Sequence, residues 1–268
     1  MSGFSAAWLQ LREPYDRRAR NAQVIEAVAD ALAGQPSVGI ADLACGTGST
    51  FRAVSPMLQP RQNWRLFDND LSLLSRAPQS SPPNIIVTTV PVDLNHDLEA
   101  ALDGPIDLVT TSALLDLVSE PWLERFAVEA AARKLPVYAA LSYDGRVEFS
   151  PADALDEKIV ASVNAHQRTN KGFGPALGPA AARAAVERFE RVGYEITQGE
   201  SDWTFEPADR EIQTEILSGW GAAAREMGDV PLHDVIDWLA RRRDLVAAGR
   251  SSIRVGHVDF FARPTGTR

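Results

Sequence analysis

Residues 40–50 read IADLACGTGST, an apolar run that ends in Asp42 and is followed by a glycine-rich turn. The run over residues 37–44 is short, apolar and contains β-branched residues, which predicts a buried strand. Gly46 and Gly48 stand where that strand should stop. Glycine has no side chain and readily reaches φ > 0, so the amides of this turn and the start of the next helix can face a ligand. The stretch therefore predicts a ligand-binding turn at the carboxyl end of a strand.

Around this turn, apolar runs alternate five times with segments of helical spacing. The expected strands cover residues 37–44, 63–68, 84–90, 105–112 and 135–143. The expected helices cover residues 22–33, 49–58, 70–77 and 120–134. Buried strands that alternate with helices are typical of a doubly wound α/β fold with a mostly parallel sheet.

After Tyr143 the pattern becomes more helical. Ser150-Pro151-Ala152-Asp153 combines a hydroxyl cap, a proline at the first position and a carboxylate at the third, which predicts a helix over residues 151–169. Further helices are expected over residues 180–192, 208–227 and 232–247, with a sixth strand over 194–205 and a seventh over 251–264. We predict one domain over residues 1–268 with a seven-stranded sheet, a lid at residues 1–21, and helical cap insertions at 144–179 and 206–250.

The amino-acid composition excludes several classes of function. The 268 residues are 45% hydrophobic and 24% charged, which is ordinary for a globular protein. The net charge is -9, whereas proteins that bind nucleic acids are usually basic, so nucleic acid is an unlikely partner. The single cysteine allows neither an intrachain disulfide nor a cysteine-rich zinc site, and no metal is predicted. We find no secretory signal and no membrane-spanning run, so we expect a cytoplasmic protein.

Two ligand classes use such a turn: dinucleotides, and nucleoside-bearing cofactors such as S-adenosylmethionine. The dinucleotide fingerprint G-x-G-x-x-G/A would need a small residue where Phe51 stands. The carboxylate of Asp42 would repel a pyrophosphate more strongly than a sulfonium cation. Asp68, at the end of the second expected strand, suits ribose hydroxyls in either class. The residues thus favour a nucleoside sulfonium over a dinucleotide.

Four stretches resemble the class I S-adenosylmethionine-dependent methyltransferases. DLACGTG (42–48) resembles their first motif, with Ala44 in place of its first glycine. FDNDLSLLSRA (67–77), VPVDL (90–94) and PIDLVTTSALLDLV (105–118) resemble the motifs that follow. The resemblance covers residues 36–143 well and 180–200 weakly. It implies the methyltransferase-like fold and S-adenosylmethionine as cofactor.

The resemblance also implies positions for the cofactor. It places Asp68 at the ribose hydroxyls, Asp93 near the adenine amino group and Leu94 beside the ring. A lid arginine or tyrosine would meet the methionyl carboxylate, although the basic residues there are equally compatible with a solvated helix face. The complete set of cofactor contacts that we expect is Tyr15, Arg20, Asp42, Ala44, Gly46, Thr47, Gly48, Asp68, Asn69, Asp93, Leu94, Thr111 and Ser112.

For the methyl acceptor the sequence offers weaker signals. Methyl transfer is an in-line displacement, and a base is needed only when the nucleophile arrives protonated. We expect catalytic roles for His166, Asp116 and Tyr143. His166 is equally compatible with a core histidine or with a cation at a helix C-terminus. We expect substrate contacts from Asn164, Arg168, Lys171 and Phe173.

The acceptor is expected to be a small molecule, and a protein acceptor remains an alternative. Methyltransferases of exocyclic amines in nucleic acids carry an Asn/Asp-Pro-Pro-aromatic turn, whereas residues 111–114 read TSAL. A nicotinamide-dependent oxidoreductase and a non-catalytic S-adenosylmethionine-binding sensor or assembly protein remain alternatives. Both a monomer and a homodimer are compatible with the sequence.

Overall fold

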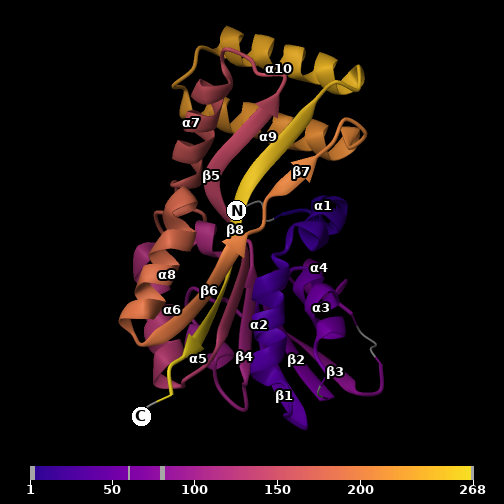
Figure 1. Ribbon diagram of the computed structural model, residues 1–268. Coiled ribbons are helices and arrows are strands. Elements are labelled where there is room, and N and C mark those ends of the chain that lie inside the picture. Colours follow the sequence, from indigo (N-terminus) through magenta and orange to yellow (C-terminus); the bar gives the residue numbers. More distant parts are fainter. Residues whose placement is uncertain (1–3, 60, 79–81, 267–268) are drawn as a thin grey trace.

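The structure is a computed structural model that describes residues 4–59, 61–78 and 82–266 (Figure 1). Residues 1–3 of the expected lid and residues 267–268 of the expected domain lie outside the described residues. A lower body contains the parallel sheet, and three helices pack on long strands above it (Figure 1). Within the described residues, no helix is both long enough and apolar enough to cross a bilayer.

The sheet confirms the predicted doubly wound α/β class. Its strand order is β3-β2-β1-β4-β5-β8-β6, with β7 paired to β8. Neighbours from β3 to β5 are parallel, and β8 is antiparallel to β5, β6 and β7. The strands are β1 (Ser37–Leu43), β2 (Arg61–Asp68), β3 (Ile85–Pro91), β4 (Leu108–Ser112), β5 (Val137–Ser150), β6 (Tyr194–Glu200), β7 (Trp203–Phe205) and β8 (Ser252–Pro264).

The predicted strand count of seven is wrong, because the expected strand over residues 194–205 is two strands. Both β6 and β7 pair with β8, but Ser201 and Asp202 between them belong to neither strand. There the Asp202 carboxylate accepts the backbone N–H of His257 at 3.0 Å and forms ion pairs with Arg146 and Arg254. The Asp202 side chain therefore accepts a backbone N–H of β8 that a backbone carbonyl would accept in a continuous strand. The sheet has eight strands as a result.

Helices cover both faces of the lower sheet, as Figure 1 shows. Side chains of β1 alternate between the two faces: Ala41 and Leu43 pack in the core beneath α6 and α8, whereas Val38 and Ile40 pack in the core beneath α2 and α3. The helices are α1 (Ala6–Ala19), α2 (Ala22–Leu32), α3 (Ser49–Val54), α4 (Leu71–Leu74), α5 (Leu98–Ala101), α6 (Glu120–Ala132), α7 (Asp156–Gln167), α8 (Ala181–Arg191), α9 (Arg210–Met227) and α10 (Leu232–Ala247).

An upper lobe is built on the far ends of β5 and β8, which run past the parallel sheet. The helices α7, α9 and α10 pack on this strand extension around a third core that contains Trp238 and Ile253 (Figure 1). The predicted start of α7 at residue 151 is wrong, because β5 continues to Ser150 and the helix begins at Asp156. The Asp156 carboxylate accepts the backbone N–H of Asp153 at 2.7 Å, which holds the turn before the helix.

Candidate functional site

The large cavity of the molecule lies at the carboxyl ends of the parallel strands. Its volume is about 770 Å³. Between β1 and β4 the strand order reverses, and ligands of doubly wound folds bind at such a switch point. The wall is formed by residues from 44–49, 68–73, 92–95, 112–117 and 171–173, together with Phe4, Leu9, Arg12 and Asp16 at the N-terminal end.

The glycine turn forms the floor of this cavity. Ala44, Gly46 and Gly48 all have positive φ, at 53°, 54° and 82°. A Cβ atom on Gly46 would stand 3.2 Å from Leu9 Cδ1, so α1 lies directly against the turn. A Cβ on Gly48 would stand 2.8 Å from the Pro78 ring, which leaves no room for a side chain. The predicted need for glycine thus comes from both backbone conformation and close approach.

Asp68 at the end of β2 holds the turn and faces the cavity. Its carboxylate accepts the backbone N–H of Gly46 at 2.8 Å and that of Asp70 at 2.9 Å. Burial raises the pKa of Asp68, although these two amides oppose the shift. Each carboxylate oxygen can accept a second hydrogen bond, so Asp68 retains acceptor capacity toward a ligand. Asn69 lies beside it in the cavity wall.

Asp42 lies beneath the turn rather than in the cavity wall. It is fully buried, and its Oδ1 accepts the Thr110 hydroxyl at 2.7 Å, while Oδ2 has no partner among the described residues. Burial raises the pKa of Asp42 to about 7. Thr111 also points away from the cavity, because its hydroxyl donates to the Leu43 carbonyl at 3.1 Å. The hydrogen bonds of Thr110 and Thr111 connect β4 to the end of β1, directly before the glycine turn.

The opposite wall carries the residues expected at an adenine ring. Asp93 and Leu94 both line the cavity. The Asp93 carboxylate accepts the N–H of Asn95 at 2.9 Å and pairs with His96 Nδ1 at 3.0 Å, which lowers the pKa of Asp93. Leu94 is buried, and its carbonyl accepts the indole N–H of Trp122 at 2.8 Å.

The N-terminal helix places different residues at the cavity from those that we expected. The Tyr15 hydroxyl donates to Asp209 at 2.9 Å, and the Tyr15 ring packs 5.0 Å from Phe205, outside the cavity wall. The Arg20 guanidinium lies behind the wall, where it donates to Ser112 Oγ at 3.3 Å. Arg12 lines the cavity instead, with its Nε 2.9 Å from Asp16 Oδ2.

Arg12 and Asp16 are therefore site residues that the sequence analysis missed. Asp16 also accepts the indole N–H of Trp203 at 2.9 Å, and the Arg12 guanidinium lies 4.9 Å from that ring. The four-residue spacing of Arg12 and Asp16 places both on one face of a helix. That spacing was the available signal, but it does not tell which face of α1 turns inward.

Of the expected catalytic residues, none is part of the cavity wall. Tyr143 donates its hydroxyl to Asn164 Oδ1 at 2.7 Å, and burial raises the pKa of Tyr143. His166 Nε2 lies 3.2 Å from Glu226 in α9. Asp116 lies just behind the wall, between Leu114 and Leu117, which both line the cavity.

Asp116 is a buried carboxylate just behind the cavity wall, next in sequence to the lining residue Leu117. It is 6% exposed, and its Oδ1 has no hydrogen-bond partner among the described residues. Burial raises the pKa of Asp116 to about 6, and the positive charge of Arg12 opposes this shift. The side chain can therefore accept a proton near neutral pH.

Two of the four expected substrate contacts reach the cavity. Lys171 and Phe173 line it, whereas Asn164 and Arg168 do not. The Phe173 ring packs edge-on against Trp122 at 5.5 Å. Lys171 Nζ lies 3.2 Å from His166 Nδ1, and burial lowers the pKa of Lys171. The structure thus brings together most of the expected cofactor residues and only the 171–173 end of the expected substrate segment.

No protein-family model and no curated protein matches the chain. Among solved structures, the cyclopropane synthase MmaA2 from Mycobacterium tuberculosis is similar with a TM-score of 0.52 at 11% identity, over 97% of this chain and 94% of that chain. The mycolic acid cyclopropane synthase CmaA1 in complex with SAH and CTAB has a TM-score of 0.48 at 12% identity, over 89% and 82%. The YcgJ protein from Bacillus subtilis has a TM-score of 0.49 at 10% identity, over 92% and 100%.

These likenesses concern the fold. The match to MmaA2 extends over nearly the whole of both chains and agrees with the predicted methyltransferase-like architecture. At this level of identity it says nothing about individual residues, so the roles of the site residues rest on the geometry described above.

Proposed function

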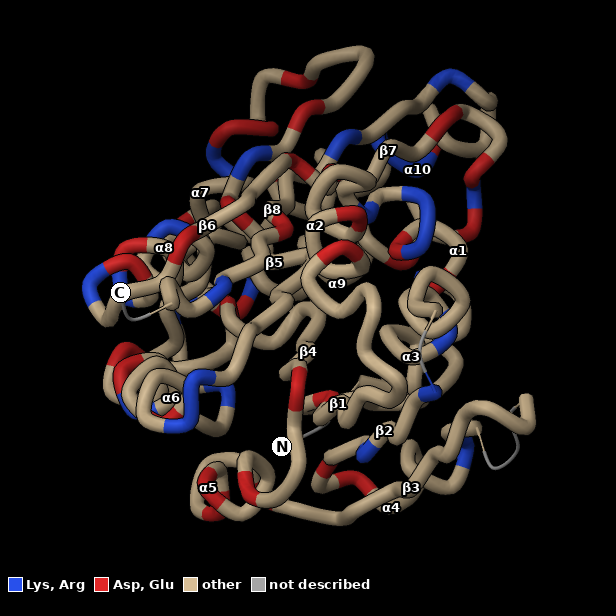
Figure 2. The backbone as a smooth tube through the Cα atoms, turned by 60° about the horizontal axis from the view of Figure 1, so that its bottom comes forward, with Lys and Arg blue, Asp and Glu red and all other residues tan. Residues whose placement is uncertain are grey.

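We propose that this protein is an S-adenosylmethionine-dependent methyltransferase that acts on a small-molecule acceptor. The observation that supports the proposal most directly is the cavity at the strand switch point, where the Asp68 carboxylate and the Gly46 turn share one wall. The fold likeness to a cyclopropane synthase is compatible with it. Basic and acidic residues are interspersed on α6 and α8 (Figure 2), so these two helices do not form a basic stripe of the kind that follows a nucleic-acid backbone.

The described residues fit the parts of this cofactor. Asp68 would accept the ribose hydroxyls, and Leu94 would provide an apolar contact for the adenine ring. Arg12 would donate to the methionyl carboxylate, since its guanidinium lines the cavity and Arg20 does not. Ala44 and Gly46 leave the backbone open to the ligand because the turn carries almost no side-chain bulk.

The acceptor would occupy the part of the cavity between residues 112–117 and 171–173. Leu114, Leu117 and Phe173 make this part apolar, and Lys171 adds one ammonium group. The whole cavity falls in the range of about 300–1,000 Å³ that drug-sized ligands occupy. It would hold the cofactor and one small acceptor, but not a folded macromolecule.

The bound cofactor supplies a methyl group on a sulfonium, which a lone pair of the acceptor displaces in line. The protein aligns the two partners and excludes water, which are the main contributions needed for such a transfer. For a hydroxyl or amine acceptor, Asp116 would take the released proton only after its side chain turned from behind the wall into the cavity; its pKa of about 6 leaves it ionised at neutral pH. For an acceptor that carries no such proton, Asp116 would remain a spectator.

Binding of S-adenosylhomocysteine tests the proposal. A ligand that binds only the folded state must raise the thermal midpoint, so we expect a saturable rise with S-adenosylhomocysteine and none with NAD. Protection by NAD alone would favour the oxidoreductase instead. Incubation of cell extract with S-adenosylmethionine, followed by mass spectrometry, separates a methyltransferase from a non-catalytic binder: a binder yields no methylated product.

Asp68→Asn tests the ribose contact. Loss of hydrogen bonds to a charged acceptor costs about 1.5–3 kcal/mol, so we expect S-adenosylhomocysteine to bind about 10- to 100-fold more weakly. Asp103→Asn, at an exposed position, is the matched control and should leave the dissociation constant unchanged. Calorimetric titration gives both values, and equal affinities for the two variants would remove Asp68 from the site.

A further inference from the structure

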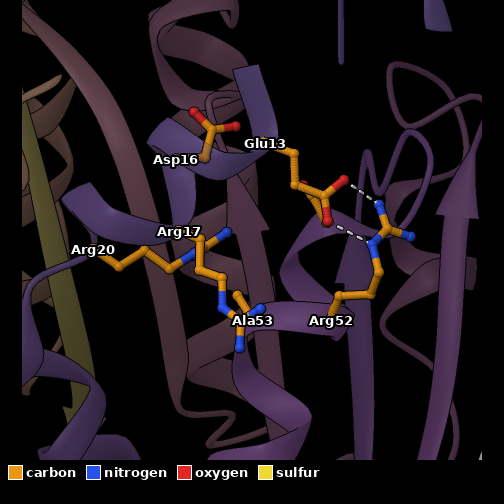
Figure 3. Close-up of a pocket in the computed structure, with 7 residues that line it drawn as sticks. Glu13, Asp16, Arg17, Arg20, Arg52 and Ala53 are labelled. Atoms are coloured by element: carbon orange, nitrogen blue, oxygen red, sulfur yellow. Dashed lines mark hydrogen bonds and ion pairs between the residues drawn. The ribbon is translucent and has the colours of Figure 1, made fainter. Parts of the chain in front are cut away.

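A second, much smaller pocket lies between α1 and α3, beside the large cavity. Its volume is about 70 Å³. Its lining comes from one face of each helix, with the spacing expected for such faces. Figure 3 shows Glu13, Asp16 and Arg17 on one helix and Arg52 and Ala53 on the other. The lining residues are Glu13, Asp16, Arg17, Arg20, Ser49, Arg52 and Ala53.

The two carboxylates of this pocket are already engaged. Arg52 Nε and Nη2 donate to the two oxygens of Glu13 at 2.5 and 2.6 Å, a two-pronged pair that joins α3 to α1 (Figure 3). Asp16 accepts hydrogen bonds from Arg12 and from the Trp203 indole. Neither acid is therefore left to balance a further positive charge.

Two arginines of the pocket lack a carboxylate partner. Within the described residues, no carboxylate lies within 4.0 Å of the Arg17 or the Arg20 guanidinium, whereas other arginines such as Arg12, Arg52 and Arg242 form such ion pairs. Arg17 makes no hydrogen bond through its side chain in the described part of the chain. Its charge stands at the mouth of the pocket without a counterion.

Arg20 is the more telling of the two, because it is only 6% exposed. Its terminal nitrogens donate to the hydroxyls of Tyr138, Thr50 and Ser112 at long distances of 3.3, 3.4 and 3.3 Å. Its Nε is buried and has no partner among the described residues. A buried guanidinium is costly unless its donors are satisfied, and this one, which lines the pocket, has three long hydrogen bonds and one unpartnered donor.

We propose that this pocket binds a tetrahedral oxyanion, with inorganic phosphate as its ligand. Arg17 and Arg20, at the C-terminal end of α1, would donate to it, whereas the charge of Arg52 is balanced by Glu13. Such oxyanions match the planar donor array of guanidinium groups. The pocket, at about 70 Å³ against about 770 Å³ for the neighbouring cavity, suits a small free oxyanion better than a nucleotide.

A bound oxyanion would also act on the neighbouring cavity. It would connect α1 to α3, the helix that follows the glycine turn. The same α1 carries Leu9, which lies on Gly46, and Arg12, which lines the cavity. Phosphate would thereby hold α1 in place over the turn, and we expect it to strengthen binding of the adenosyl ligand. This second effect rests on the proposed function, whereas phosphate binding itself does not.

Titration of the full chain with inorganic phosphate, at constant ionic strength and with chloride as reference, tests the site. We expect a saturable rise of the thermal midpoint with phosphate alone. Arg17→Gln should weaken phosphate binding at least tenfold, because it removes a positive charge that has no carboxylate partner. Since Arg17 is exposed, the replacement should leave the fold intact. Arg18→Gln is the matched control: Arg18 belongs to the same helix, but its guanidinium lies over the Tyr15 ring at 4.5 Å. Equal loss in both variants, or an equal response to chloride, would overturn the proposal.

Joint titration with S-adenosylhomocysteine separates the two proposals. Simultaneous binding, with S-adenosylhomocysteine bound at least twofold more tightly in phosphate, would support a separate site. Mutual exclusion of phosphate and S-adenosylhomocysteine would overturn it, because the pocket would then be part of the cofactor cavity. Failure of S-adenosylhomocysteine to bind under any condition would contradict the proposed function and leave the phosphate result standing.

Discussion

At the scale of single residues, the buried Asp42 should make stability depend on pH. Its pKa is about 7 in the folded protein against an ordinary 3.8, so the folded state holds the proton more tightly. The free energy of unfolding should therefore fall as the pH rises from about 4 to about 7, with a slope of up to about 1.4 kcal/mol per pH unit from this group.

Asp42→Asn removes this titration while keeping an oxygen for the Thr110 hydroxyl. We expect the variant to gain stability relative to the wild type between pH 5 and pH 8. Urea unfolding at both pH values measures the difference. If wild type and variant change in parallel over this range, Asp42 is already ionised in the folded protein at pH 5.

The sequence was informative at the turn because the chemistry there is local. A strand end, two glycines and the acid at the end of the next strand lie close in the chain, and all of them meet at the cavity. Arg12 could not be singled out in the same way. Which arginine of α1 faces inward depends on how the helix is rotated, and that is set by contacts of Trp8 with Trp203 and of Tyr15 with Phe205. These partners lie nearly 200 residues further along the chain.

At the scale of elements, the rotation of α1 decides which side chains can reach a cofactor. Tyr15→Phe should lower the free energy of unfolding by about 1–2 kcal/mol, because it removes the hydrogen bond to Asp209. Affinity for S-adenosylhomocysteine should change less than twofold, since Tyr15 lies outside the cavity wall. Tyr194→Phe, which loses a hydrogen bond to the Leu135 carbonyl far from the cavity, is the control for stability. A tenfold loss of affinity in Tyr15→Phe would show that α1 is rotated differently around the ligand.

The alternation of strands and main helices in the lower body followed from periodicity, but the short helix α5 (Leu98–Ala101) was not expected, and two boundaries after Tyr143 were wrong. A carboxylate interrupts the ladder between β6 and β7, and β5 runs on to Ser150 where a helix cap was expected. In both places a long-range partner overrides a local signal: His257 binds Asp202, and Ser150 pairs with Ser252 of β8. Local propensities cannot reveal such partners, because the pairing strand comes about 50 to 100 residues later.

At the scale of the whole molecule, a buried ion pair ties the upper lobe together. Arg242 is fully buried; it pairs with Asp156 and donates to the Pro151 carbonyl at 2.6 Å. Asp156→Ala would leave this guanidinium uncompensated, so we expect a loss of about 3–5 kcal/mol of stability. Arg241→Ala, which breaks the exposed pair with Asp153, should cost less than about 1 kcal/mol.

The same variant tests whether the lobes unfold together. Tryptophan fluorescence, far-ultraviolet circular dichroism and release of S-adenosylhomocysteine should follow one urea transition in Asp156→Ala, because β5 and β8 belong to both lobes. An early fluorescence change that leaves S-adenosylhomocysteine bound would instead identify the upper lobe as an independent folding unit.

The unbroken passage of β5 and β8 between the lobes constrains how the cavity is filled. Two domains joined by a single linker can move apart by bending it, whereas these two lobes share the paired strands β5 and β8, whose register shifts twice between Ala139 and Val147. We therefore expect a ligand to enter by movement of wall segments outside the sheet, such as the N-terminal helix and residues 171–173.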